Sequence, residues 1–186
     1  MFPLLRALIY GSLFVALLLV LLPARVLEWS GVSRPEPWGA AQAAGAAITV
    51  LGAAVAVWCV LAFALVGRGT PAPFDPPRRL VVSGPYRFVR NPMYIGAGLA
   101  LAGASLFYGS AALLGYTALL GLVTHLFVTR YEEPTLSRTF GAEYTAYRSR
   151  VRRWRPGRGT GSRFGTESHR PLRDTDQMDP LKRPGA

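Results

Sequence analysis

The feature that most constrains this chain is a set of long apolar runs that contain almost no charged residues. In residues 40–66, AAQAAGAAITVLGAAVAVWCVLAFALV, only Gln42 and Thr49 are clearly polar. A helix that crosses about 30 Å of hydrocarbon at about 1.5 Å per residue needs about 20 mostly apolar residues. This run therefore predicts a transmembrane helix.

An earlier apolar run, residues 7–22, has two interpretations. Arg6 before it and Ala24 after it resemble the flanks of a signal peptide. Pro23, which we expect to end this helix, and the further apolar runs later in the chain favour a retained membrane helix instead. We therefore count residues 7–22 as the first of the predicted crossings.

The third apolar run, residues 93–129, predicts a helical hairpin. It carries no charged side chain except for a possible charge on His125, and it is too long for one crossing. A turn within residues 107–110, FYGS, would divide it into two helices. The predicted fold class is thus all-α, an integral membrane bundle of about four transmembrane helices whose last two form a hairpin.

The distribution of arginine predicts the orientation of this bundle. The chain has a formal net charge of +11. Residues 23–39 hold two arginines and two glutamates, whereas residues 67–91 hold five arginines and one aspartate. Loops rich in Lys and Arg stay in the cytoplasm. We expect a multi-pass protein whose two termini, second loop and active site face the cytoplasm.

Small residues in the second and third predicted helices indicate close helix contact, because they let two backbones approach each other. These residues are Gly45, Gly52, Ala53, Ala56, Gly96, Ala97, Gly98, Ala100, Ala102 and Gly103.

After the hairpin the sequence predicts a C-terminal amphipathic helix at the membrane surface. Apolar side chains recur at helical spacing, with charged residues between them. Gly141 lies inside this helix and makes a break there possible. The recurring residues are Leu136, Phe140, Tyr144, Tyr147 and Val151.

The chain divides into three predicted parts. Residues 1–66 form two transmembrane helices, and residues 67–156 form a core of cytoplasmic loop, hairpin and C-terminal helix. Residues 157–186 are rich in Gly, Pro, Ser and charge, which predicts a disordered basic tail. The lone Cys59 excludes a disulfide framework, and no metal site is expected.

Charged residues gather at one end of the predicted hairpin. Arg90 precedes the hairpin and Glu132 and Glu133 follow it, so the returning chain places them at the same membrane depth. An interfacial belt of arginine and tyrosine is the simpler interpretation. Carboxylates at a boundary that favours positive charge, however, indicate pairing with Arg90 or with a ligand.

Two motifs in this region carry a resemblance to known proteins. GPYRFVRNPMYIG at residues 84–96 is followed by the uncharged hairpin and then by EEPTLSRTFGAEYTAYRSRVRRWRP. Over residues 80–156 this arrangement resembles the C-terminal half of the isoprenylcysteine carboxyl methyltransferase family and of the related phospholipid methyltransferases.

The resemblance implies methyl transfer from S-adenosylmethionine to a lipophilic acceptor, either a carboxylate like that of isoprenylcysteine or a lipid. It implies Arg90 and Glu133 as catalytic residues. Where many members have histidine, this chain has Asn91, which can still donate and accept hydrogen bonds. The implied cofactor-binding residues are Gly84, Tyr86, Arg90, Asn91, Pro92, Tyr94, Glu132, Glu133, Tyr144 and Tyr147.

His125 has two open interpretations. It is seven residues before Glu132, which predicts that the two share a helix face. It is a candidate catalytic base for an amine or phenol acceptor, since ionisable residues inside membranes are functional candidates. A histidine that bonds a neighbouring backbone carbonyl is the other interpretation.

A function of a different class is a small non-catalytic membrane protein, such as a transporter subunit or scaffold with a basic lipid-binding tail. A transporter would place polar groups near the middle of the membrane or repeat itself in two halves. Here the polar groups gather at one end, which favours the methyltransferase. The expected partners are the membrane and a lipophilic acceptor, and nucleic acid is not expected.

Overall fold

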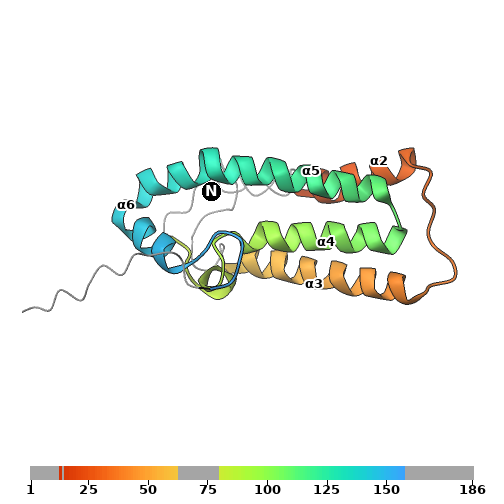
Figure 1. The fold of residues 1–186 in the computed structure, drawn as a ribbon, viewed down its shortest axis with the longest axis horizontal. Coiled ribbons are helices and arrows are strands. Elements are labelled where there is room, and N and C mark those ends of the chain that lie inside the picture. Colours follow the sequence, from red (N-terminus) through yellow and green to blue (C-terminus); the bar gives the residue numbers. More distant parts are fainter. Residues whose placement is uncertain (1–12, 14, 63–79, 158–186) are drawn as a thin grey trace, which may run out of the picture.

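The computed structural model of the chain describes residue 13, residues 15–62 and residues 80–157. Helices and loops make up this described part, and the helices lie roughly parallel to one long axis (Figure 1). In chain order they are η1 (Leu17–Leu21), α2 (Leu22–Trp29), α3 (Ala40–Ala62), η3 (Gly84–Arg87), α4 (Pro92–Tyr108), α5 (Ala111–Phe127), η4 (Val128–Glu132) and α6 (Glu133–Arg150).

Helices α3 and α4 pack side by side along their lengths, with glycines at the contact (Figure 1). A Cβ added at Gly52 would lie 2.5 Å from the carbonyl oxygen of Gly96, and one added at Gly103 would lie 2.6 Å from that of Gly45. Both distances are too short for a side chain. The predicted contact through small residues is confirmed at these four glycines, which lie seven residues apart on each helix.

The turn between α4 and α5 lies at the predicted place. Gly109 follows α4 with φ of 60°, the left-handed conformation that glycine adopts without strain. Ser110 then caps α5, because its Oγ accepts a hydrogen bond of 3.2 Å from the backbone N–H of Leu113. The hairpin prediction is therefore confirmed, and α5 runs back beside α4.

The expectation that Pro23 ends the first helix is wrong. Pro23 lies in the first turn of α2, which continues to Trp29, and η1 precedes it without a break. Proline lacks an N–H and its ring clashes with the carbonyl one turn earlier. The π-helical turn η1 widens the helix just before the proline and relieves this conflict. The earlier part of the predicted run, residues 7–12 and 14, lies outside the described residues.

Among the described residues, two helical stretches are long and apolar enough to cross a membrane: α3, and Ala111–Arg150, which comprises α5, η4 and α6 and is interrupted at Gly141. Helix α4 is apolar but shorter. Large apolar side chains on α3 and α5, among them Val50 and Leu119, are exposed to the surroundings, as expected for helices that face lipid. The protein is thus a membrane-associated helical protein, and four crossings remain a prediction.

The C-terminal helix begins differently from the prediction. No boundary separates the fourth predicted crossing from α6, because the π-helical turn η4 joins them and places Pro134 in the first turn of α6. The break comes at Gly141, with φ of 50° and ψ of −119°, as the sequence made possible. Beyond it the chain turns back toward the start of α4 (Figure 1).

The apolar residues of this C-terminal region pack together, but the break at Gly141 divides them, and an amphipathic helix at the membrane surface remains a prediction. Tyr144, Tyr147 and Val151 form a buried cluster against which Leu80, Leu136 and Phe140 pack. Residues 158–186 of the predicted tail, residues 63–66 of the second predicted helix and residues 67–79 of the predicted loop lie outside the described residues.

Candidate functional site

The candidate site lies where the loop before α4 meets the segment that follows α6. Gly84 opens η3 with φ of 58°, and Pro92 occupies the first turn of α4. The backbone N–H of Arg90 donates a hydrogen bond of 2.9 Å to the carbonyl of Arg152. The amide of Asn91, which is buried, lies 3.4 Å from the carbonyl oxygen of Arg153 and donates to it. These two bonds hold the C-terminal segment against the first motif.

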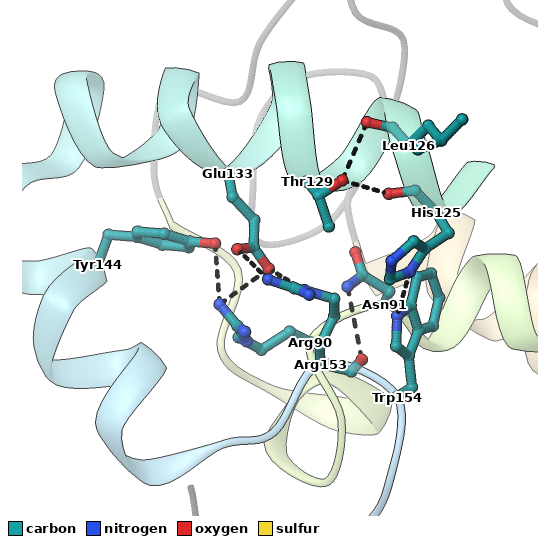
Figure 2. A network of polar contacts seen from close by, with 9 residues as sticks. All are labelled: Arg90, Asn91, His125, Leu126, Thr129, Glu133, Tyr144, Arg153 and Trp154. Carbon is teal, nitrogen blue, oxygen red and sulfur yellow. Dashed lines mark hydrogen bonds and ion pairs between the residues drawn. The ribbon is translucent and has the colours of Figure 1, made fainter. Parts of the chain in front are cut away.

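Glu133 is the centre of a buried charge cluster (Figure 2). Arg153 donates to it through two parallel bonds, Nε to Oε1 at 2.6 Å and Nη2 to Oε2 at 2.8 Å. Arg90 Nη1 lies 3.1 Å from Oε1 of the same carboxylate and 3.2 Å from the hydroxyl of Tyr144. One carboxylate therefore neutralises much of the charge of two guanidinium groups, in the bidentate geometry that arginine favours.

One buried side-chain atom of this cluster is left without a partner. Arg90 Nε is buried and has no hydrogen-bond partner among the residues that the structure describes. Buried donors are nearly always satisfied, so an orphaned guanidinium N–H needs an explanation. A ligand that supplies an acceptor oxygen is one such explanation.

The ionisation of Glu133 follows from its partners. Burial raises the pKa of this carboxyl, but the hydrogen bonds from Arg153 and the charges of Arg90 and Arg153 outweigh burial and leave the pKa below its ordinary value. The pKa of Arg153 is raised, chiefly by its hydrogen bond to Glu133. At neutral pH the cluster is thus a charged one.

Glu132 lies apart from this cluster, although the sequence predicted that both carboxylates would converge on Arg90. Its Oε2 accepts a hydrogen bond of 3.0 Å from the hydroxyl of Tyr94 on α4. Burial raises the pKa of Glu132, the charge of Glu133 adds to the effect, and the bond from Tyr94 opposes it. Adjacent residues on a helix point in directions about 100° apart, so two neighbouring carboxylates serve two different surroundings.

His125 lies two turns before Glu133 on the same side of the helix (Figure 2). Its Nδ1 accepts a hydrogen bond of 3.1 Å from Trp154 Nε1, and its backbone carbonyl accepts one of 2.8 Å from Thr129 Oγ1. The sequence paired His125 with the face of Glu132, but the π-helical turn η4 contains an extra residue, which brings Glu133 to that side instead. Neither interpretation of His125 included the contact with Trp154.

The remaining predicted site residues are tyrosines that surround this cluster. Tyr144 and Tyr147 are buried, with ring centroids 6.3 Å apart. The hydroxyl of Tyr147 donates a bond of 2.7 Å to the carbonyl of Tyr86, itself buried between Cys59 and Val81. These tyrosine rings lie beside Arg90, and the hydroxyl groups of Tyr144 and Tyr147 are hydrogen-bonded.

Arg153 and Trp154 are the residues of this cluster that the sequence analysis missed. They belong to the stretch RRWRP, which directly follows the amphipathic helix. The signal was present, because a tryptophan among arginines is unusual for a solvated tail. Its three arginines look alike in sequence, however, and only the fold shows which of them meets Glu133.

Comparison with known proteins gives one match. Residues 40–143, more than half of the chain, match the family model described as phospholipid methyltransferase. The match begins in α3, earlier than the resemblance over residues 80–156 had indicated. No curated protein and no solved structure matches the chain.

Proposed function

The chain belongs to the phospholipid methyltransferase family, and on that premise we propose that it transfers a methyl group from S-adenosylmethionine to a lipophilic acceptor at the membrane surface. The family is one of membrane methyltransferases, which supports an enzyme over a scaffold or transporter subunit. The proposed acceptor is a lipid or a lipophilic carboxylate like that of isoprenylcysteine.

The observation that carries this proposal is the buried, partnerless Nε of Arg90. S-adenosylmethionine ends in an amino acid, whose carboxylate needs a cation with free N–H groups. Arg90 offers such a group while Glu133 and Tyr144 occupy its Nη1. The residues present therefore fit the carboxylate end of this cofactor.

The neighbouring residues fit the rest of the cofactor in kind. Glu132 and Tyr94 form a hydrogen-bonded pair that is able to bind hydroxyl or ammonium groups. Tyr144 and Tyr147, which are buried, are proposed to form the aromatic wall of the pocket beside Arg90. Glu133, held by two arginines, is proposed to orient Arg90, while Gly84, Tyr86, Asn91 and Pro92 shape the loop that carries it.

The proposed methyl transfer depends mainly on the alignment of its two reactants. When bound, S-adenosylmethionine supplies a methyl group on a positively charged sulfur. Holding two reactants in line contributes on the order of 7–11 kcal/mol to lowering a barrier. Arg90, fixed by Glu133 and by its backbone bond to Arg152, provides a rigid anchor for one reactant. An ionised carboxylate acceptor would need no general base.

The test compares two arginines of the same loop. In Arg90→Lys the positive charge beside Glu133 remains but the planar guanidinium and its Nε–H are lost. We expect the affinity for S-adenosylhomocysteine, measured by calorimetric titration in detergent, to fall at least tenfold, about 1.4 kcal/mol. Arg87→Lys, at an exposed position three residues earlier, is the matched control and should bind as the wild type does.

A second arm identifies the acceptor. Wild-type protein is incubated with labelled S-adenosylmethionine and total membrane lipid, and the labelled lipid is identified.

Two outcomes would contradict these proposals. Unchanged affinity of Arg90→Lys for S-adenosylhomocysteine would reject the assignment of Arg90 to the cofactor. Absence of any labelled product would reject the methyltransferase activity itself.

A further inference from the structure

We propose that Trp154 is a positioning residue that holds His125 in the neutral tautomer with its proton on Nε2, so that His125 donates a hydrogen bond to an oxygen anion of the methyl acceptor. This inference rests on the proposed function, because it concerns the acceptor of that same site. It assigns His125 the role of a donor in place of that of a base.

The main evidence is the direction of one hydrogen bond, from Trp154 to His125. The two atoms 3.1 Å apart are Trp154 Nε1 and His125 Nδ1. An indole N–H only donates, so Nδ1 must accept. A neutral imidazole has one N–H and one acceptor nitrogen, and an imidazolium has two N–H groups and no acceptor. The contact is therefore compatible with a single form of His125, neutral and protonated on Nε2.

Trp154, the donor of this hydrogen bond, is held in place by its neighbours. Trp154 follows Arg153, whose guanidinium is fixed by two bonds to Glu133 and whose carbonyl accepts from Asn91. The indole and imidazole centroids lie 6.0 Å apart with planes 36° from parallel, so the rings meet mainly through the N–H···N contact. The same segment that completes the charge cluster thus sets the tautomer of His125 (Figure 2).

This tautomer leaves one group of His125 available. Its Nε2–H has no hydrogen-bond partner among the residues that the structure describes, and the side chain is half-buried. A free N–H binds oxygen lone pairs and takes up no proton, while Nδ1 is already engaged. His125 therefore fits an acceptor that carries an oxygen anion, either a carboxylate or a phosphate ester.

The tautomer is tested by nitrogen-15 NMR of histidine-labelled protein in detergent. The chain has two histidines, and His125→Gln assigns the signal of His125. We expect the Nε2–H form in the wild type and a mixture of tautomers in Trp154→Phe, which keeps an aromatic ring but has no N–H. A wild-type imidazolium, or a proton on Nδ1, would overturn the proposal without any variant having to fold.

The role is tested by kinetics. His125→Gln keeps an N–H donor and His125→Leu does not, so we expect kcat/KM of His125→Leu to fall at least tenfold below that of His125→Gln, about 1.4 kcal/mol. Loss of a general base typically costs about 10²–10⁴-fold. A loss above 100-fold in a His125→Gln protein that still binds S-adenosylhomocysteine would identify a base and refute the donor role.

The source of the oxygen anion is tested by two probes. Farnesylcysteine supplies a carboxylate, and phosphatidylethanolamine supplies a phosphate. A shift of the His125 Nε2 resonance with one of them supports the donor contact and identifies its source, and no shift with either overturns that contact. If wild-type protein fails to bind S-adenosylhomocysteine, the proposed function is wrong, whereas the tautomer is measured without any ligand.

Discussion

Replacing Glu133 by glutamine should destabilise this protein more than any other conservative change of a carboxylate in the described residues. The substitution keeps the size of the side chain and removes its charge. The guanidinium groups of Arg90 and Arg153 then lose their shared counter-ion. Glutamine also brings an NH₂ group that faces guanidinium donors and cannot bond to them.

The size of the effect follows from burial. The side chains of Glu133 and Arg90 are 8% and 10% exposed, so this pair is shielded from water. Removing one partner of such a buried pair costs about 3–5 kcal/mol, because the other charge stays buried without compensation. The side chain of Arg153 is 29% exposed, and water can solvate it after the change. We therefore place the expected cost near the lower end, at about 3 kcal/mol.

The assay is the free energy of unfolding in mixed detergent micelles, measured for wild type, Glu133→Gln and Glu143→Gln. Glu143 lies on the same helix and is exposed, so its replacement is the matched control and should change the free energy by less than about 0.5 kcal/mol. A Glu133→Gln protein within 1 kcal/mol of wild type, by the same scale, would refute the conclusion that the pair is desolvated.

The pH dependence of this difference has a defined sign. The pKa of Glu133 in the folded protein lies below the ordinary value of 4.5. Its contribution to stability is therefore fully present above about pH 4.5 and is lost as the pH falls through the lowered pKa. The wild-type and Glu133→Gln stabilities should converge in that acidic range. A gap that stays constant down to pH 2 would contradict an ionised Glu133.

Three further predictions concern neighbouring features of the fold. The pKa of Glu132 is raised, so the contribution of this carboxyl to stability is lost as the pH rises through that pKa. Glu132→Gln should therefore be at least as stable as the wild type at pH 7, and the difference should shrink below pH 4.5. A marked loss of stability in Glu132→Gln at pH 7 would contradict this. Gly52→Ala should cost about 1–3 kcal/mol of unfolding free energy by forcing α3 from α4, whereas Gly98→Ala, which meets no atom within 4 Å, should not. Cysteines introduced at the exposed Arg34 and Arg87 should react with an impermeant thiol reagent from opposite sides of the membrane, and labelling from one side would refute the predicted topology.

Much of the fold could be predicted because the length of an apolar run and the positive φ of a glycine are properties of the local sequence. The run that became α3 is long enough to cross a bilayer, and this required no knowledge of its neighbours. Gly109 at the hairpin turn and Gly141 at the break both adopt positive φ, a conformation that glycine makes cheap. The spacing of seven residues between Gly45 and Gly52 places both on one helix face.

The helix register could not be predicted, because π-helical turns leave no distinct mark in sequence. Both turns precede a proline in the first turn of the next helix, Pro23 after η1 and Pro134 after η4. In sequence, Pro23 indicates the end of a helix, and Pro134 gives no sign of a widened turn before it. The structure shows that a widened turn accommodates it, and this shift decides that Glu133, and not Glu132, meets Arg90.

The site depends on three turns of the chain acting together. The hairpin at Gly109 returns α5 to the level of Arg90, η4 rotates Glu133 toward it, and Gly141 sends the helix back so that Arg153 reaches the same carboxylate. Each of these turns brings a charge to a place that it could not reach along a straight helix. Because burying a lone charge is costly, the cluster forms only when all three are in place. The same dependence explains why an otherwise apolar chain concentrates its buried charges at one point, where a ligand would bond to Arg90 Nε, the only buried side-chain nitrogen or oxygen that the described residues leave without a partner.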